Sequence, residues 1–458
     1  MARKYFVETF GCQMNFHDSE RVAGLLEHEG YQAADSVVDA DLVVVNTCSV
    51  RERAADKLYS RLGEIQEATA GRAIAPVIAV TGCVAQQEGQ ALFRRSTPID
   101  VVVGTQALKQ LPALVDRTLE SRKPQLDIHP YDDVSFPLGV VRHADPVRAR
   151  VTIIEGCNEF CAFCVVPYTR GHERMRPVAD ILAECRLAAD SGHREVQLLG
   201  QIVNHYQAPD DATCDFAGLL ERVSEIPGLA RIRFASPHPR HVTDRLIAAI
   251  RDLPKVCKHL HLPVQSGSDR VLRAMRRRYT RDEYFALVDR ARAAVPDLAV
   301  TTDMIVGFPG ETAEDFDLTL DLVRRARFHA MYSFKYSPRP NTLAIKRLPD
   351  DVGEGDKTSR ILALQALQAD IQTEWHRQTV GRTVEVLVEG PSKRRGWELT
   401  GRTTGYTVVN FPGPEAWVGE LLPVQVTSAE PHSLRGESRG NFELRTQNLE
   451  LRASDPEF

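Results

Sequence analysis

The chain has 458 residues, 43% of them hydrophobic and 26% charged, so its composition excludes a disordered protein and predicts two to three folded domains. A net charge of −5 excludes a globally basic nucleic-acid binder, so RNA would have to be held by local basic patches. No apolar stretch approaches the ~20 residues that span a bilayer. The amino terminus turns polar too early for a secretion signal, and the nine cysteines are an odd number. We therefore expect a cytoplasmic protein with no membrane partner.

Residues 1–120 alternate strand-like and helix-like segments. The predicted strands are Lys4–Thr9, Asp41–Asn46, Ala75–Thr81 and Asp100–Gly104. The predicted helices, which show helical spacing of apolar residues, are Ser19–Glu29, Glu52–Ala68 and Ala107–Leu119. Strands that alternate with helices form a parallel sheet, so this region predicts an α/β, Rossmann-like domain.

Three cysteines of this domain, Cys12, Cys48 and Cys83, each follow a different predicted strand. Because the carboxyl ends of parallel strands meet at one edge of a sheet, where ligands bind, the three thiols should converge. Free cysteine is also a common small buried residue, so the alternative is plain packing. Recurrence in three strand-to-helix loops favours a metal centre, in which three thiolates hold a four-iron cluster and leave one iron open.

A stretch rich in Pro and Asp, residues 121–142, breaks the periodicity and is predicted to be a linker. Helices such as Val178–Ser191 and Asp282–Ala293 then alternate with six further strands. These predicted strands are Arg150–Ile154, Glu195–Leu199, Arg231–Ala235, His259–Val264, Ala299–Val306 and Ala330–Tyr336. Six βα units are too few for a closed barrel of eight, so residues 143–377 predict a partial (βα)6 barrel.

A second group of cysteines, Cys157, Cys161 and Cys164, follows the first strand of this barrel with C-x3-C-x2-C spacing. Three thiolates on one short loop suit three corners of an iron–sulfur cluster. A structural zinc site needs four ligands, and His172 could be the fourth, so zinc is the alternative. A disulfide framework suits small secreted domains and not a chain of this length.

Polar residues cluster after other barrel strands, on the face where such barrels bind ligands. They include Gln201, Ser236, Gln265 and the segment Gly307–Glu311, whose two glycines permit a close approach of backbone to a ligand. Strand-end loops are polar in most proteins, and Gly307–Glu311 could equally be a turn before the helix at Ala313–Arg327. Their recurrence in one layer favours a shared cavity.

Residues 378–441 change to short alternating strands separated by turns, which predict a small β-barrel of the oligonucleotide-binding kind. The predicted strands are Thr383–Val388, Glu398–Thr400, Tyr406–Asn410 and Leu422–Thr427. The candidate RNA-binding cations are Lys393, Arg394, Arg395 and Arg402, which stand near the rings of Trp397, Tyr406, Phe411 and Trp417. The alternative is that the rings form the barrel's own core. Residues 442–458 are polar and predict a tail.

Longer motifs carry a specific resemblance. They are Gly11-Cys12-Gln13-Met14-Asn15, Asn46-Thr47-Cys48-Ser49-Val50-Arg51, Gly82-Cys83-Val84-Ala85-Gln86, Gly156–Gly171, Leu262–Ser268, Ile305–Thr312 and His432–Gly436. Together they resemble the methylthiotransferase family of radical S-adenosylmethionine (SAM) enzymes over nearly the whole chain. The resemblance implies a methylthiotransferase domain over 1–120, a radical SAM core over 143–377 and a TRAM RNA-binding barrel over 378–441.

Within that family, Gly11–Asn15 is most similar to the branch that acts on tRNA, where C2 of N6-isopentenyladenosine 37, beside the anticodon, gains a methylthio group. The resemblance implies two [4Fe–4S] clusters. One would be held by Cys12, Cys48 and Cys83, and the other, which also binds SAM, by Cys157, Cys161 and Cys164. The candidate SAM contacts that it implies are Phe163, Gln201, Ser236, Gln265, Gly307 and Glu311. In the family, one SAM methylates sulfur at the first cluster, and a second SAM is cleaved to a radical.

The resemblance also implies partners. They are the anticodon stem-loop of tRNA, an electron donor such as flavodoxin or ferredoxin, and a sulfur-supply protein, while the chain itself is expected to be a monomer. Departures from the family pattern at Ile202, His205 and Asn341 affect only the expected substrate contacts. Other functions stay open: a methylthiotransferase for a ribosomal protein side chain or for threonylcarbamoyl-adenosine in tRNA, and a non-enzymatic iron–sulfur RNA-binding sensor.

Overall fold

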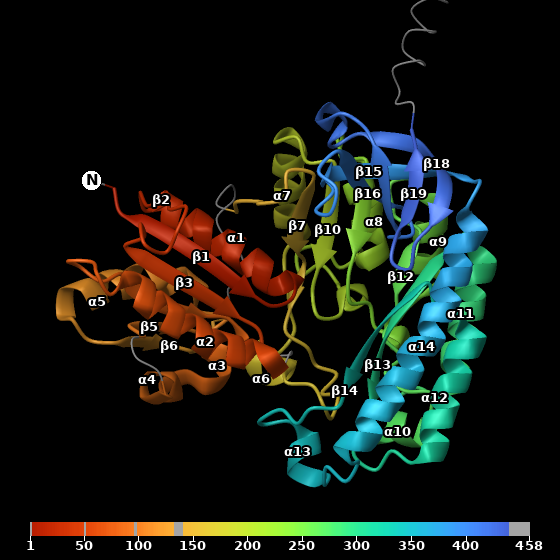
Figure 1. Cartoon of the computed structure of the whole chain (residues 1–458), viewed down its shortest axis with the longest axis horizontal. Coiled ribbons are helices and arrows are strands. Elements are labelled where there is room, and N and C mark those ends of the chain that lie inside the picture. The colour runs from red at the N-terminus through yellow and green to blue at the C-terminus, as the bar shows by residue number, and fades with distance from the viewer. Residues whose placement is uncertain (1, 50–51, 96–98, 132–140, 439–458) are drawn as a thin grey trace, which may run out of the picture.

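A computed structural model describes residues 2–49, 52–95, 99–131 and 141–438, arranged as two α/β units and a small β-barrel (Figure 1). The amino-terminal unit is a six-stranded parallel sheet in the order β2-β1-β3-β4-β5-β6. Its strands are β1 (Lys4–Phe10), β2 (Gln32–Ala33), β3 (Leu42–Thr47), β4 (Val77–Thr81), β5 (Val101–Val103) and β6 (Gln125–Asp127). The first five follow the flavodoxin-like order of doubly wound sheets, whose ligands bind beside the first and third strands.

Helices cover both faces of this sheet, because its central strands are apolar on both sides. Every residue of β3 is buried, as expected for a strand in the middle of a parallel sheet. One face packs against α1 (Gln13–His28) and α5 (Leu111–Ser121). The other packs against α2 (Glu52–Thr69), α3 (Cys83–Glu88) and α4 (Leu92–Arg95), and two short 3₁₀ turns, Gly89–Ala91 and Leu108–Gln110, complete the unit.

The second unit is a partial barrel of six parallel strands in two halves, β11-β10-β7 and β12-β13-β14. A single bridge between Ile232 and Val256 lies where the halves meet. The strands are β7 (Arg148–Thr152), β10 (Glu195–Leu199), β11 (Arg231–Phe234), β12 (His259–His261), β13 (Ala299–Val306) and β14 (Ala330–Lys335). This arrangement confirms the predicted partial barrel.

Helices on the outside of the barrel bury one large apolar core against the strands. They are α7 (Val178–Asp190), α8 (Phe216–Ser224), α9 (Asp244–Asp252), α11 (Arg281–Ala294) and α12 (Ala313–Ala326), whereas α10 (Asp269–Ala274) contributes Val271 to a separate, smaller cluster. Shorter elements sit at the strand ends, namely β8 (Ile154–Glu155), α6 (Val166–Thr169), β9 (Arg174–Met175), α13 (Leu343–Arg347) and the 3₁₀ turns Val203–His205 and Pro239–His241. Thr280 and Thr312 cap α11 and α12 through reciprocal capping boxes, which explains where these helices begin.

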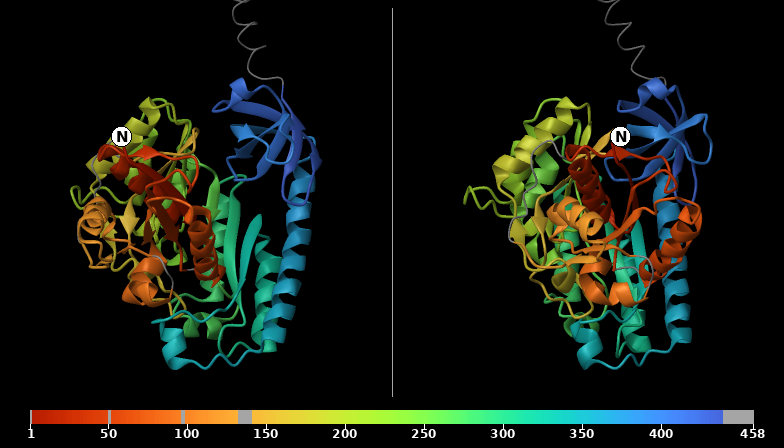
Figure 2. Two further views of the ribbon diagram at one scale, coloured as in Figure 1. Left: turned by 60° about the vertical axis from the view of Figure 1, so that its left-hand side comes forward. Right: turned by 90° about the vertical axis from the view of Figure 1, so that its left-hand side faces the viewer.

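The third unit is a closed five-stranded barrel that follows the long helix α14 (Glu354–Thr379), which runs along the side of the core (Figure 2). Its strands are β15 (Thr383–Pro391), β16 (Glu398–Thr403), β17 (Val408–Pro412), β18 (Leu421–Ala429) and β19 (Leu434–Glu437), with a 3₁₀ turn at Glu415–Trp417. Their inward residues, among them Val386, Val409 and Phe411, form the barrel's own core. This confirms the small C-terminal barrel.

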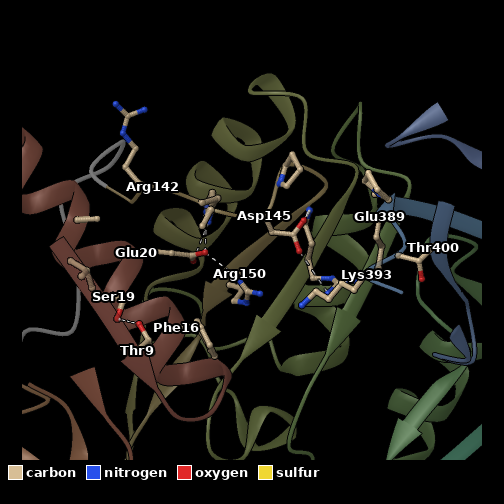
Figure 3. Close-up of a pocket in the computed structure, with 18 of the residues that line it drawn as sticks. Thr9, Phe16, Ser19, Glu20, Arg142, Asp145, Arg150, Glu389, Lys393 and Thr400 are labelled. Carbon is tan, nitrogen blue, oxygen red and sulfur yellow. Dashed lines mark hydrogen bonds and ion pairs between the residues drawn. The ribbon is translucent and has the colours of Figure 1, made fainter. Parts of the chain in front are cut away.

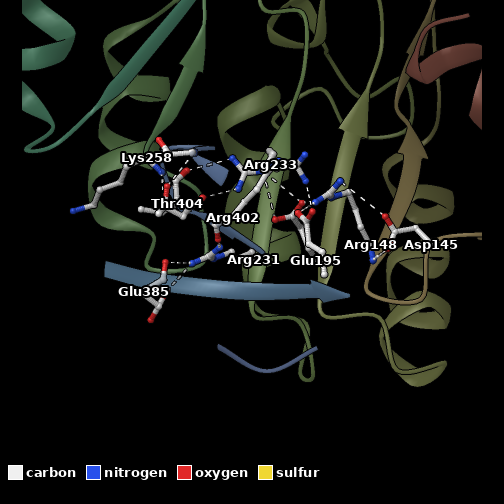
Figure 4. A network of polar contacts seen from close by, with 12 residues as sticks. Asp145, Arg148, Glu195, Arg231, Arg233, Lys258, Glu385, Arg402 and Thr404 are labelled. Atoms are coloured by element: carbon white, nitrogen blue, oxygen red, sulfur yellow. Dashed lines mark hydrogen bonds and ion pairs between the residues drawn. The ribbon is translucent and has the colours of Figure 1, made fainter. Parts of the chain in front are cut away.

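Buried charges join this barrel to the core (Figure 4). Arg148 pairs with Glu195 of the core and with Glu389 of the barrel. Arg233 donates to the Thr403 carbonyl at 3.2 Å, and the Lys258 N–H donates to Thr404 Oγ1 at 2.8 Å. Because each buried charge has a partner, the joint fixes the relative orientation of the two units.

One feature differs from the sequence expectation. The stretch 121–142 was predicted to be a linker, but β6 pairs with β5 as the last strand of the first sheet, so that part of the prediction is wrong. Residues 132–140 of the same stretch, and the predicted tail 442–458, lie outside the described residues. Across the described part of the chain, no helix combines the length and the apolar character that a membrane span needs.

Candidate metal centre

The amino-terminal cysteines lie at the carboxyl edge of the first sheet, as the sequence predicts. Cys12 follows β1 and precedes α1, Cys48 follows β3, and Cys83 is the first residue of α3 after β4. The backbone N–H of Cys48 donates to the Phe10 carbonyl at 2.8 Å, which ties two of the three loops together. The centre therefore lies beside β1 and β3, where doubly wound sheets of this order bind their ligands.

Two buried asparagines hold these loops in register. The Asn15 side-chain amide donates to Asn46 Oδ1 at 2.9 Å, and the Asn46 amide donates back to the Asn15 carbonyl at 2.8 Å. Asn15 Oδ1 in turn accepts a hydrogen bond from Cys12 Sγ at 3.3 Å. Gly82 has a φ of +89° and no room for a side chain, since a Cβ would lie 2.3 Å from Asn46 Oδ1. From the sequence alone, Asn15 and Asn46 could equally be loop caps. In the structure they position the cysteine loops.

The three thiols share one electrostatic environment. A hydrogen bond with the Cys48 thiol lowers the pKa of Cys12 to about 6, assisted by the charge of Arg170 and opposed by burial. Burial raises the pKa of Cys83, while Arg170 lowers it and the charge of Cys12 raises it further. Thiolate is the form that binds iron, so a nearby buried cation suits this donor set.

The second group of cysteines lies on the loop between β8 and α6. Cys157 donates its N–H to the Gly171 carbonyl at 3.1 Å, and Cys164 donates to the Cys161 carbonyl at 3.0 Å. Burial raises the pKa of both Cys157 and Cys164 to about 12. The loop needs Gly156, whose φ is +82° and whose Cβ would lie 2.0 Å from the His172 carbonyl oxygen.

Sequence reasoning missed two buried arginines at these centres. Arg277 donates to Cys161 Sγ at 3.3 Å and to the Pro263 carbonyl at 2.9 Å. In the sequence it belongs to a basic run that reads as exposed surface, yet it is buried. Arg170 is buried and pairs with Asp18 of α1, and no local pattern distinguishes it from the other basic residues of its motif.

The zinc alternative finds no support in the geometry. A tetrahedral zinc ion needs ligand atoms about 3.8 Å apart, because Zn–S bonds are about 2.3 Å long. Within the described ranges, the single group of three ligand atoms that all lie within 4.8 Å of one another is Glu159, His238 and His241, and it contains no cysteine. His172 instead contacts Asn158 Oδ1 at 2.9 Å. Each triad is thus more open than a single ion requires.

Buried polar atoms around the first triad support a larger group. The hydroxyls of Thr47, Ser49 and Thr81 are buried beside the cysteines without hydrogen-bond partners among the described residues. An unpaired buried hydroxyl is costly, so a bound group that accepts hydrogen bonds would satisfy them. The sulfide and thiolate sulfurs of an iron–sulfur cluster are such acceptors, and the residues present fit the group.

The predicted SAM contacts gather at the carboxyl ends of the barrel strands, with different roles. Gln201 Oε1 accepts the Gly156 N–H at 2.6 Å, so its side chain orients the cysteine loop. Glu311 is buried, accepts the Gly307 N–H, and pairs with Arg360 of α14 at 2.8 Å; its Oε1 has no described partner. The backbones of Ser236 and Gln265 have positive φ angles, which non-glycine residues rarely adopt. Phe163, also a predicted contact, packs against a small apolar cluster.

The predicted RNA contacts divide into two kinds. Lys393, Arg394 and Arg395 lie exposed between β15 and β16, next to Trp397, which is 63% exposed. Arg402 pairs with Glu389 and stacks over Tyr406, so its guanidinium is held in the joint between barrel and core. The rings divide likewise, as Phe411 is buried in the barrel core and Trp397 is exposed.

A cavity of about 930 Å³ lies between the first sheet and the carboxyl-terminal barrel (Figure 3). α1 and β1 form one wall, residues 142–150 form the floor, and the β15–β16 hairpin forms the opposite wall. Lys393 and Arg150 supply positive charge to it, and Glu20 and Glu389 supply negative charge.

Comparison with known proteins defines the class first. Family models match the uncharacterized protein family UPF0004 over residues 4–104, the radical SAM superfamily over 151–323 and the TRAM domain over 377–438. Among solved structures, the radical SAM methyltransferase TsrM from Kitasatospora setae has a TM-score of 0.55 with 14% identity and covers 83% of this chain and 79% of that one. With the cysteine triads at the strand ends, this defines a radical SAM fold.

Full-length relatives then define the family. The tRNA-2-methylthio-N(6)-dimethylallyladenosine synthase of Syntrophotalea carbinolica is 44% identical over 437 residues, 95% of this chain and 99% of that one. The protein of the same name from Burkholderia ambifaria is 46% identical over 455 residues, 95% of this chain and 97% of that one. The chain belongs to the family of tRNA-2-methylthio-N(6)-dimethylallyladenosine synthases.

Proposed function

We propose that the chain is a radical SAM tRNA methylthiotransferase that adds a methylthio group to C2 of N6-isopentenyl(dimethylallyl)adenosine at position 37 of tRNA. The observation that carries this proposal is the full-length identity of 44–46% with synthases of that name, together with the two cysteine triads. The same relatives give no support to a ribosomal-protein substrate or to a sensor without catalysis.

Two cysteine sets would hold the cofactors. Cys12, Cys48 and Cys83 would hold one [4Fe–4S] cluster, and Cys157, Cys161 and Cys164 would hold a second, to which SAM binds. When bound, these groups supply the sulfur, methyl and radical chemistry that the reaction needs. Each set offers three thiolates, which leaves one iron of each cluster open to a ligand.

The residues of the chain supply position and exclusion of water. The C2–H bond of adenine is not acidic near neutral pH, so general acid–base groups could not start the reaction. The segment from α6 to Gly171 links the second centre to the first unit, since the Gly171 carbonyl binds the Cys157 N–H and Gln106 donates to the Arg170 carbonyl at 2.7 Å. The adenine would have to lie between the two centres to react at both.

RNA would be held mainly by the carboxyl-terminal barrel. Lys393, Arg394 and Arg395 would bind phosphates, and exposed Trp397 would stack on an unpaired base. One wall of the cavity beside this hairpin is α1, the helix that follows Cys12, so an anticodon loop bound to the barrel would lie near the unit that carries the first triad. An unpaired base can be turned out of the loop into a site more easily than a base in a duplex.

The remaining partners are part of the proposal. The chain would work as a cytoplasmic monomer, receiving electrons from a flavodoxin or ferredoxin and sulfur from a separate supply protein. The described cysteines are all free, as a reducing compartment requires.

Anaerobic assays test this function directly. The purified chain is incubated with SAM, a reductant and tRNA that carries N6-isopentenyladenosine, and the nucleosides are analysed by mass spectrometry. We expect 2-methylthio-N6-isopentenyladenosine, and none from tRNA that lacks the isopentenyl group. Product from threonylcarbamoyl-adenosine tRNA alone, or SAM binding without any modified nucleoside, would contradict the proposal.

A further inference from the structure

Arg170 stands out among the buried charges that the proposed chemistry does not use. Its side chain is 3% exposed, and Nη2 donates to Asp18 Oδ2 at 2.5 Å. Nη1 is buried without a hydrogen-bond partner among the described residues. Burying a guanidinium with one N–H group paired and another unpaired costs free energy, unless a negative group lies beside the unpaired N–H.

The position of Arg170 identifies that negative group. Asp18 lies on α1, the helix that begins directly after Cys12. Arg170 directly follows α6, which contacts α3, the helix that begins at Cys83. Arg170 is also one of the charged groups that act on the thiols of both Cys12 and Cys83. Arg170 therefore lies beside the first triad, with Asp18 and Glu155 as its other anionic neighbours, although it belongs to the core that carries the second triad.

We infer that Arg170 is a positioning residue that balances the charge of the cluster on Cys12, Cys48 and Cys83 and thereby sets its reduction potential. Three thiolates give such a cluster a net negative charge, and each added electron makes it more negative. A buried cation stabilises the reduced form more than the oxidised form, so it raises the potential. Because the cation comes from the core, the first cluster reaches this potential only when the two units are docked. This inference rests on the proposed cluster assignment.

Arg21 provides a matched control. It lies on α1, is buried, and also crosses to the core, where its Nη1 donates to Glu155 Oε1 at 2.5 Å. Removing it disturbs the same interface, but the hydrogen bond that it loses is with Glu155 and not with a residue of the first triad. A comparison of Arg170→Gln with Arg21→Gln thus separates charge at the cluster from docking of the two units.

The test uses the full chain with Cys157, Cys161 and Cys164 replaced by Ala, so that only the first cluster remains, and a redox titration followed by electron paramagnetic resonance. We expect Arg170→Gln to raise the oxidised-to-reduced ratio at a fixed potential at least tenfold, about 59 mV for one electron. Arg170→Lys should restore most of the difference, and Arg21→Gln, which keeps the Arg170–Asp18 pair, should shift the ratio far less than Arg170→Gln.

Two results would overturn the inference: an unchanged ratio in Arg170→Gln, or an equal shift in Arg21→Gln. If Arg170→Gln holds no iron, the lysine variant decides. A cluster retained in Arg170→Lys supports the inference that the cluster needs a positive charge at this position. Loss of the cluster in both variants contradicts the inference. A parent chain that binds no iron at Cys12, Cys48 and Cys83 would instead refute the proposed function, so the two failures are distinguishable.

Discussion

At the scale of single residues, the proposed chemistry depends on six of the nine cysteines. We predict that Cys12→Ala or Cys157→Ala abolishes the methylthio product, because each leaves its triad with two thiolates, while the fold is retained. Cys185→Ala is the control, since Cys185 is buried in the core and lies in neither triad. Mass spectrometry of nucleosides from cells that carry only the variant measures the outcome. Normal product in either triad variant would contradict the assignment.

Gly156 makes a second prediction at this scale. Gly156→Ala would force a Cβ to within 2.0 Å of the His172 carbonyl oxygen at a φ of +82°, so it should displace the Cys157 loop and cost about 1–3 kcal/mol of stability. Gly192→Ala has a similar φ of +94° but nothing within 4 Å of the added Cβ. Iron content after anaerobic purification should fall in the first variant and stay normal in the second. Equal iron content in both would show that the loop tolerates the displacement.

The sequence predicts residue roles where the signal is local and misses them where it is not. The C-x3-C-x2-C spacing of Cys157, Cys161 and Cys164 is enough to predict a cluster-binding loop. Arg277 could not be found this way, because its partner Cys161 is 116 positions away and the arginine sits in a basic run. Gln201 was found by position, but its bond to the Gly156 N–H, which defines its role, depends on two strands that only the fold brings together.

At the scale of elements, α1 is the contact between the first sheet and the core. Along one face it carries Asp18, Glu20 and Arg21, which pair with Arg170, Arg150 and Glu155 of the core. A helix whose inward face is charged would be unstable alone, so its position depends on these partners. Docking of the two units therefore depends on pairs whose carboxylates must stay ionised.

Acid should weaken this docking. Burial alone would raise the pKa of Glu20, but His143, His17 and Arg150 lower it by more, so it lies below its usual value of 4.5. A lowered pKa means that the ionised form stabilises the folded state above about pH 4.5 and that this contribution is lost as pH falls further. Limited proteolysis near residues 141–147 should accelerate below pH 4.5, and Glu20→Gln should make it fast at neutral pH also. Cleavage that is independent of pH in the parent would contradict this.

The elements themselves were predictable to different degrees. β10 and β13 have the predicted bounds, because short segments rich in Val, Leu and Ile identify strands even where polar residues such as Gln197 and Asp303 interrupt them. β6 was missed because three residues give no periodicity, and it gains its place only by pairing with β5. α14 was missed because its apolar residues do not gather on one face, although Lys357 and Arg360 of this helix reach Gly307 and Glu311.

At the scale of the whole molecule, the carboxyl-terminal barrel is rigidly joined to the core and presents one exposed basic hairpin. We predict that replacing Lys393, Arg394 and Arg395 together with Ala weakens tRNA binding and lowers the slope of log affinity against log salt by about two, since each phosphate contact contributes about 0.7 in single strands. The matched control removes Arg117, Arg122 and Lys123, which are exposed at the far end of α5. Equal losses in both variants would show a non-specific charge effect.

We propose that one chain carries two iron–sulfur centres, one on each α/β unit. Iron and acid-labile sulfide analysis of the anaerobically purified chain tests it most directly, with each cysteine triad replaced by Ala in turn. We expect about eight irons and eight sulfides per parent chain and about four of each in either triad variant. An amino-terminal triad variant with the same iron content as the parent, or zinc without sulfide in the parent, would contradict it.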